Sequence, residues 1–298
     1  MWVSGALLSS FLLGIYYIFQ KSSLRGNAVL SVLFLSTLFS SLLFVPFILL
    51  SSFGALPAGN FFHVPSGNSQ AHAAVLLKSC IVFSSWFCGY YAIKNLSITL
   101  VGPVKASQPV LTLLGATLLL GEHLNGYQWI GVSLGIASLF FMSRTSKTEG
   151  VNFGSNRFIW LLFLSVIFGA VSGLYDKYLM LRFDRMFVQS WYLLYQTLLS
   201  GFFFLLLRNN RIFGNVKFQW RNTIPFIAIF LSAADLVYFW ALSQPGAMIS
   251  IISMIRRSSV LVSFLGGVFI FRENNIRAKA FDLLLILAGL IFLYIGSK

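Results

Sequence analysis

The chain has 298 residues, of which 58% are hydrophobic and only 9% are charged. A water-soluble domain of this composition would expose too much apolar surface, which excludes a soluble protein and favours an integral membrane protein. The net charge of +14 does not indicate nucleic-acid binding, because the basic residues are scattered between hydrophobic stretches and do not line one helix face or tail.

Ten apolar stretches are each long enough for a helix that crosses a bilayer, which needs about 20 residues. In chain order they cover residues 2–19, 28–50, 73–93, 99–120, 127–143, 158–178, 187–207, 223–242, 248–271 and 279–295. The first stretch lacks a basic leader and a small-residue cleavage site, so we expect an uncleaved helix. The sequence therefore predicts an all-α integral membrane protein with ten transmembrane helices.

Two of these stretches repeat the same pattern at a fixed offset, which indicates a duplicated chain. The matching pairs are Lys105 with Arg256, Ser107 with Ser258, Leu114 with Leu265, Gly115 with Gly266, and Glu122 with Glu273. The tripeptide Phe19-Gln20-Lys21 is likewise echoed by Tyr175-Asp176-Lys177. Five helices in each half is an odd number, so the second half must enter the membrane from the opposite face. We expect two inverted five-helix repeats, at 1–143 and 158–298, with a polar linker at 144–157 and a shared site near the bilayer midplane.

Basic residues lie inside two of the matching helices. Lys105 is followed by Gln108 and Thr112 at helical spacing on one face. Arg256 and Arg257 are too deep for both to reach the interface, and adjacent helix positions point about 100° apart. One arginine could therefore hold a neighbouring helix while the other faces a cavity. For Lys105, a side chain that extends to the membrane interface is the alternative interpretation.

These cations outnumber the carboxylates that the sequence puts inside a helix. Four cations, which include Lys78, are set against Asp235 as the one carboxylate clearly within a predicted helix. A ligand anion would complete the site, because the planar guanidinium of arginine suits phosphate or carboxylate. Asp235 could pair with one arginine, with Tyr238 one turn away. Its rival role is that of a proton-coupling carboxylate.

Polar and aromatic side chains on other predicted helices could complete a pocket, although each alone is more often a packing or interface residue. They are Tyr17, Gln20, Trp86, Tyr90, Ser172, Tyr175, Gln189, Tyr192, Gln196 and Trp240. His63, His72 and His123 fall in predicted loops without metal-ligand spacing, and the sequence has neither a phosphate-binding glycine loop nor a catalytic triad. We therefore expect no metal, no cofactor and no enzymatic activity.

The two halves of five spans, and the stretch from Pro109 to Glu122 that ends in Leu-Leu-Leu-Gly-Glu, resemble the drug/metabolite transporter superfamily, including its EamA-type bacterial members. Shorter motifs resemble its triose-phosphate and nucleotide-sugar translocator branch: Lys105-Ala106-Ser107-Gln108-Pro109, Arg256-Arg257 and Tyr175-x-Lys177. In that branch the equivalents of Lys105, the arginine pair and Tyr238 hold the substrate phosphate. Gln108 replaces a glutamate of the branch motif, and Arg256 replaces a lysine.

The resemblance implies a secondary transporter that moves a small organic anion, such as a phosphorylated metabolite, by alternating access as an antiporter. One alternative is a proton-coupled EamA-type exporter of amino acids or other metabolites, with Asp235 as the proton carrier. Another is a non-transporting membrane subunit or receptor that binds an anionic lipid. The expected partners are a small-molecule substrate and the lipid bilayer. We expect a monomeric multi-pass protein of the bacterial inner (plasma) membrane.

Loop charges and the resemblance disagree about orientation. Thirteen basic residues are predicted on the face opposite the termini: Lys21, Arg25, Lys94, Arg144, Lys147, Arg157, Arg208, Arg211, Lys217, Arg221, Arg272, Arg277 and Lys279. Only Lys177, Arg182, Arg185 and Lys298 share the face of the termini. The positive-inside rule therefore predicts both termini outside, whereas members of the superfamily usually keep both termini in the cytoplasm.

Overall fold

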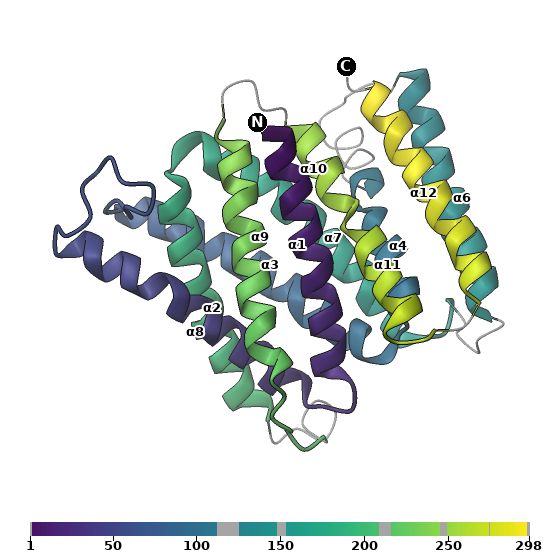
Figure 1. Cartoon of the computed structure of the whole chain (residues 1–298), viewed down its shortest axis with the longest axis horizontal. Helices are drawn as coiled ribbons and strands as arrows, with labels where there is room; N and C mark the ends of the chain where they lie inside the picture. Colours follow the sequence, from purple (N-terminus) through teal and green to yellow (C-terminus); the bar gives the residue numbers. More distant parts are fainter. Residues whose placement is uncertain are drawn as a thin grey trace.

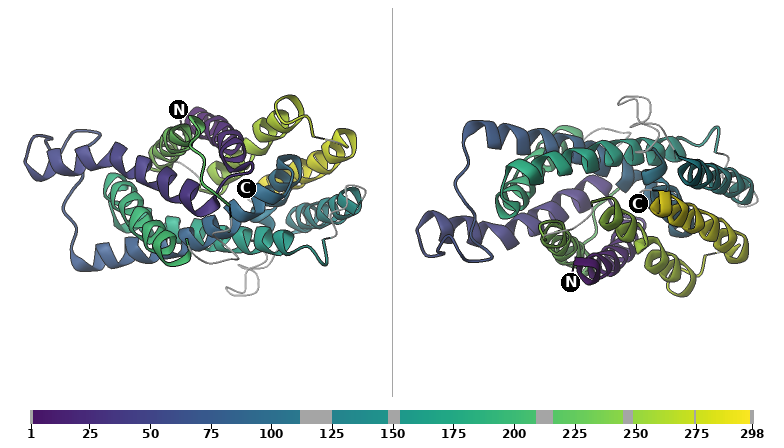
Figure 2. Two further views of the ribbon diagram at one scale, coloured as in Figure 1. Left: turned by 90° about the horizontal axis from the view of Figure 1, so that it is seen from below. Right: turned by 90° about the horizontal axis from the view of Figure 1, so that it is seen from above.

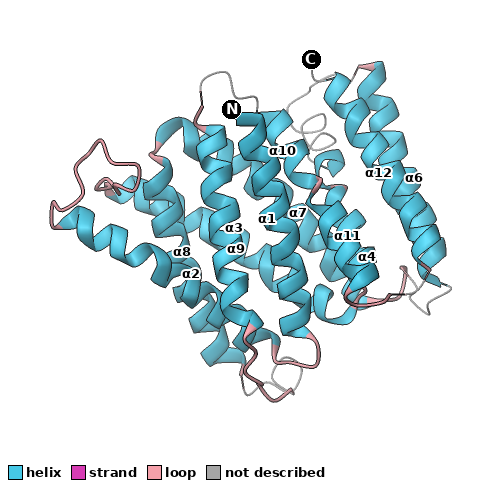
Figure 3. Cartoon of the chain, viewed as in Figure 1, coloured by secondary structure: helices cyan, strands magenta, loops and turns pink. Residues whose placement is uncertain are grey.

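A computed structural model describes residues 2–111, 125–147, 153–208, 216–244, 249–273 and 275–296. Within these residues the secondary structure is helical, without strands (Figure 3). Seven of the described helices are long and apolar enough to cross a membrane: α1 Trp2–Leu24, α2 Val29–Ser52, α3 Ser69–Asn95, α7 Arg157–Arg182, α8 Arg185–Leu207, α9 Thr223–Leu242 and α12 Ile276–Gly296. The predicted all-helical membrane class is confirmed.

The other three predicted spans do not belong to these seven helices, and two of them are interrupted. The span at 127–143 lies within α6 Gly126–Lys147, which is not among the seven. The span at 99–120 begins as α4 Ile98–Ala106, is interrupted at Ser107, and leaves the described residues after 111. The span at 248–271 consists of two helices, α10 Ile249–Arg257 and α11 Ser259–Phe269.

The two interruptions lie one or two residues after the central cations and have the same local hydrogen bond. The Ser107 hydroxyl donates to the carbonyl of Val104 (2.7 Å), and the Ser258 hydroxyl donates to the carbonyl of Ile255 (2.6 Å). Such bonds to a carbonyl three residues back compete with the helical pattern. Near Ser107, Pro109 adds a second cause, because it has no N–H for the carbonyl four residues before it.

Helices from one half of the chain pack against helices from the other half. α1 lies along α9, α3 along α7, α2 along α8, and α6 along α12. α4 crosses α11 so closely that a Cβ added at Gly102 would lie 2.6 Å from a methyl group of Val260. The bundle is elongated, with α6 and α12 at one end and α2 at the other, and both termini lie on the same side (Figures 1 and 2).

The turn between α3 and α4 is held by charged side chains from α1 and from the segment that follows α11. The Glu273 carboxylate accepts hydrogen bonds from the backbone N–H groups of Ile98 (2.7 Å) and Thr99 (2.9 Å), and from the Thr99 hydroxyl. The Lys21 ammonium donates to the carbonyl of Ile93 (2.7 Å) at the end of α3. These contacts satisfy helix-end groups that have no partner within the helix. They fix the start of α4, the helix that carries Lys105.

Candidate functional site

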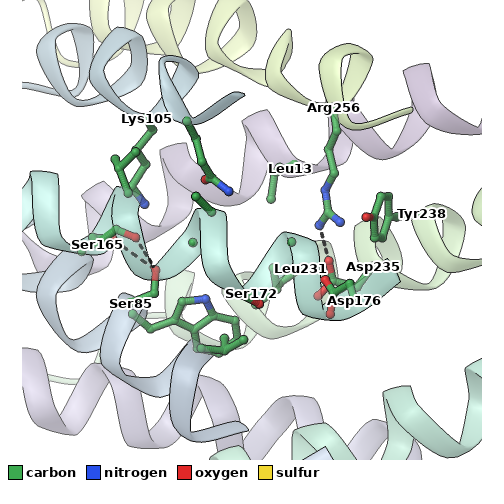
Figure 4. A pocket seen from close by; sticks show the side chains of 18 of the residues that line it. Leu13, Ser85, Lys105, Ser165, Ser172, Asp176, Leu231, Asp235, Tyr238 and Arg256 are labelled. Atoms are coloured by element: carbon green, nitrogen blue, oxygen red, sulfur yellow. Dashed lines mark hydrogen bonds and ion pairs between the residues drawn. The ribbon is translucent and has the colours of Figure 1, made fainter. Parts of the chain in front are cut away.

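A cavity of about 580 Å³ lies among α1, α3, α4, α7, α8, α9 and α10. This volume is typical of pockets for small molecules, which range from roughly 300 to 1,000 Å³. Figure 4 shows Lys105 near Ser165 at one end, and Arg256 with Asp235 and Asp176 at the other.

Most of the predicted site residues line this cavity: Trp86, Tyr90, Lys105, Gln108, Asp235, Tyr238, Arg256 and Arg257. From the wider set of polar and aromatic candidates, the cavity is also lined by Tyr17, Gln20, Ser172 and Tyr192. Gln108 packs over α7, where a Cβ at Gly169 would lie 2.8 Å from its Oε1 atom. Thr112 lies outside the described residues.

Several candidate site residues do not line the cavity. The main one is Tyr175, which was predicted to contact the substrate. Its hydroxyl donates to the carbonyl of Ala74 (3.2 Å) and its ring stacks on Tyr178. The reason is the helical turn of about 100° per residue, which directs the neighbouring Asp176 into the cavity and Tyr175 away from it. The remaining candidates that are not cavity-lining residues are Gln189, Gln196 and Trp240.

Two of the four cations in the cavity form ion pairs with carboxylates. Arg256 pairs with Asp235 and so joins α10 to α9, and its guanidinium carbon lies 4.2 Å from the ring centroid of Tyr238. Lys78 pairs with Asp176 and so joins α3 to α7. The expectation of a single intramembrane carboxylate was therefore wrong. Asp176 lies near the end of the predicted stretch 158–178, but α7 continues to Arg182 and keeps it well inside the helix.

The other two cations, Lys105 and Arg257, have no carboxylate partner among the described residues. The Lys105 ammonium lies 4.8 Å from the ring centroid of Tyr17. The Nε atom of Arg257 is buried and has no hydrogen-bond partner among the described residues. Both cations and Tyr17 also line a small crevice of about 10 Å³ beside the cavity, which is room for about one water molecule.

The described lining is therefore positively charged overall. Of the described lining residues, Lys78, Lys105, Arg256 and Arg257 are cationic, whereas Asp176 and Asp235 alone are anionic. Two positive charges thus have no protein counter-charge within the described part of the wall. An anion with two negative charges would neutralise them.

Lys279, which was predicted on a membrane face, and His72, which was predicted in a loop, both lie in helices and contact other segments of the chain. Lys279 lies in α12, is 0% exposed, and its ammonium is 3.4 Å from the hydroxyl oxygen of Ser97. His72 lies in the first turn of α3, where its Nδ1 atom and the hydroxyl of Tyr195 are hydrogen-bonded at 2.9 Å. His123 lies outside the described residues.

Comparisons with known proteins give one family and one fold. Residues 1–144 match the model of the EamA-like transporter family. No curated protein matches the chain. Among solved structures, one titled "Crystal structure of protein" is similar with a TM-score of 0.65 and 15% sequence identity, and the alignment covers 99% of this chain and 98% of that chain. At this identity the likeness shows the fold alone.

Proposed function

We propose that this chain, whose residues 1–144 match the EamA-like transporter family, is a membrane transporter that moves a small organic anion across the bilayer. The proposal is carried by one observation, the two cations of the cavity wall that lack a described counter-charge, Lys105 and Arg257. A cation at the centre of a bilayer costs about 2.5 to 3.5 kcal/mol on insertion scales. An anionic substrate removes this cost for both side chains.

A phosphorylated metabolite fits the excess charge best. A phosphate monoester carries about −1.5 to −2 charges at pH 7, which is close to the two uncompensated charges of the wall. Arg257 can present its planar guanidinium to two phosphate oxygens, and Lys105 supplies a point charge. Arg256 is paired with Asp235 and contributes mainly to the positive electrostatic potential of the cavity. Tyr238 lines the cavity and offers its hydroxyl as a hydrogen-bond group for the substrate.

Alternating access is supported by signs of inverted repeats. The interruptions at Ser107 and Ser258 fall at matching positions of the two halves. In an inverted repeat α1 corresponds to α7 and α3 to α9, so the contact of α1 with α9 becomes the contact of α7 with α3 when the halves are exchanged. We propose that the halves rock about the cavity and expose it to each face in turn.

The same charges favour exchange over one-way transport. Without a bound anion, closing the cavity on both sides would bury two uncompensated cations in a medium that solvates them poorly. With a bound dianion the closed state is close to neutral. A carrier of this kind changes sides more readily when loaded, so anions on the two faces would be exchanged.

Transport measurements on purified protein in liposomes test this function. Uptake of radiolabelled inorganic phosphate or glycerol 1-phosphate should require an organic phosphate inside the vesicle. Lys105→Ala or Arg257→Ala should weaken binding at least about tenfold, because losing a charged hydrogen bond to a ligand typically costs about 2 to 5 kcal/mol. Arg257→Lys should restore binding only in part, since the ammonium loses the two-pronged geometry.

The matched control is Arg182→Ala, which removes an exposed arginine of α7 that bonds only to Tyr178 in the described residues. It should leave binding unchanged. If the Lys105 and Arg257 variants bind and transport as the parent does, these cations are structural and the anion site does not exist.

A second candidate function is proton-coupled export of amino acids or other metabolites. It is favoured by the two carboxylates on the cavity wall, Asp176 and Asp235. Transport that depends on a pH gradient and not on an internal anion would support it. Binding of an anion without any uptake would instead favour a non-transporting receptor for an anionic lipid.

A further inference from the structure

Gln20 has an unusual place in the cavity wall. It lies in α1, is 1% exposed and lines the cavity. Its Oε1 atom is buried without a hydrogen-bond partner among the described residues. Buried polar atoms normally have a partner, and an exception calls for a water molecule or a ligand.

Neighbouring side chains hold Gln20 in place. The amide interacts with the Tyr90 side chain of α3, and the Tyr90 hydroxyl is hydrogen-bonded to Ser36 of α2 at 3.1 Å. Gln20 is therefore connected through Tyr90 to a fixed polar group on a third helix. An amide oriented in this way can select a ligand, because it does not need to be ordered again on binding.

The position of Gln20 relative to the cations matters as well. Tyr17, whose ring faces the Lys105 ammonium, precedes Gln20 by three residues. Side chains three residues apart lie on the same face of a helix, and both line the cavity. An anion held by Lys105 and Arg257 would thus have its carbon skeleton within reach of Gln20.

Comparison of the halves gives the same indication. In the echoed tripeptides Gln20 corresponds to Asp176, and both line the cavity. Asp176 is paired with Lys78, whereas the Oε1 atom of Gln20 has no described partner. At these matching positions the side chain on α7 has its partner within the protein, whereas the side-chain oxygen on α1 is left for a ligand.

We infer that Gln20 is a specificity-determining residue that accepts a hydrogen bond from a hydroxyl or N–H group on the carbon skeleton of the substrate. This inference rests on the proposed function, since it requires an anion at Lys105 and Arg257. A site built to bond a substrate hydroxyl rejects analogues that lack it, because its own polar group is then left unpaired. The substrate is therefore an organic anion with a hydrogen-bond donor a few atoms from its charge.

Two phosphate esters of equal carbon number test the inference. Glycerol 1-phosphate carries two hydroxyl groups and propyl phosphate carries none. The parent protein should bind glycerol 1-phosphate at least about tenfold more tightly, which is the effect of one satisfied buried polar group. In Gln20→Leu the preference should fall below about threefold, because glycerol 1-phosphate loses its hydrogen bond and propyl phosphate no longer leaves the Gln20 oxygen unpaired.

Two further variants separate recognition from folding. Gln20→Glu keeps an acceptor oxygen at the same place and should retain the preference for glycerol 1-phosphate. Its negative charge should lower the affinity for both esters by the same factor. Gln189→Leu is the matched control, because Gln189 is equally buried, has no described partner for either amide atom and does not line the cavity. It should change neither affinity.

The outcomes distinguish this inference from the function on which it rests. If both esters bind in a Lys105-dependent manner and Gln20→Leu retains the parent preference, the inference fails and the anion site stands. Gln20 would then bond a resident water molecule. If neither ester binds the parent protein, the anion site fails and this inference fails with it.

Discussion

At the scale of single residues, the cavity divides its cations into two kinds. Arg256 and Lys78 are balanced by carboxylates on neighbouring helices, whereas Lys105 and Arg257 have no carboxylate partner in the part of the chain that the structure describes. Removing one member of a buried ion pair leaves an uncompensated charge, which is more damaging than removing both. The paired cations are therefore expected to affect folding first, and the unpaired cations are expected to affect ligand binding first.

The first prediction at this scale concerns Asp235. Asp235→Asn leaves Arg256 unbalanced and should destabilise the protein by about 3 kcal/mol, the lower limit for a broken buried pair, because this pair faces a cavity. Thermal unfolding of the purified protein in detergent measures the loss. Asp184→Asn is the control, since Asp184 caps α8 outside the cavity and asparagine caps a helix equally well.

The opposite result would change the assignment of Asp235. If Asp235→Asn folds normally, keeps anion exchange and loses only gradient-driven uptake, the carboxylate is a proton carrier. The pairing with Arg256 would then be an incidental resting contact.

The sequence predicted the cations of the site better than their partners. Lys105, Arg256 and Arg257 are visible as charges deep within apolar stretches, and Asp235 is visible in the same way. The pair of Lys78 with Asp176 joins residues that are 98 positions apart, and helical periodicity contains no information about which helices touch. Tyr175 was predicted at the cavity for a related reason. The sequence does not give the rotation of a helix about its own axis, so it does not show which side chains face the cavity.

At the scale of helices, the site depends on how α4 and the α10–α11 pair are held. The sequence predicted continuous spans, whereas both are interrupted next to the cations. Pro109 could have indicated the interruption at Ser107. The one at Ser258 has no proline in the described residues around it, and only its match with Ser107 in the repeat could have indicated it.

The prediction at this scale concerns Glu273, whose carboxylate holds the first turn of α4. An anion at a helix N-terminus stabilises by about 0.3 to 2 kcal/mol, with the largest values at partly buried sites. Glu273→Gln should therefore lower the free energy of unfolding by about 1 to 2 kcal/mol, and it should weaken phosphate binding through the displacement of Lys105.

Arg272→Gln provides the control, because it neutralises the exposed neighbour of Glu273 and leaves the carboxylate in place. Both variants are compared by thermal unfolding with and without phosphate. Equal stability of the Glu273→Gln and Arg272→Gln proteins would show that the carboxylate does not hold α4.

At the scale of the whole molecule, the helix lengths follow from the sequence but their arrangement does not. Among the described helices, eight predicted spans correspond to single long helices, because an apolar stretch of about 20 residues has few other options in a bilayer. The contacts of α1 with α9 and of α3 with α7 join distant segments. No local pattern specifies such pairs, and only the repeat restricts them.

The prediction at this scale concerns orientation. Both termini lie on one side of the bundle (Figure 1), so reporters at either end should give the same result. Lys279 is buried and is therefore no longer counted as a loop charge. The remaining basic residues still lie mostly on the face opposite the termini. Since cytoplasmic loops carry the excess of lysine and arginine, a reporter fused after Lys298 should be extracytoplasmic. A cytoplasmic signal would instead mean that the usual orientation of the superfamily prevails over the loop charges.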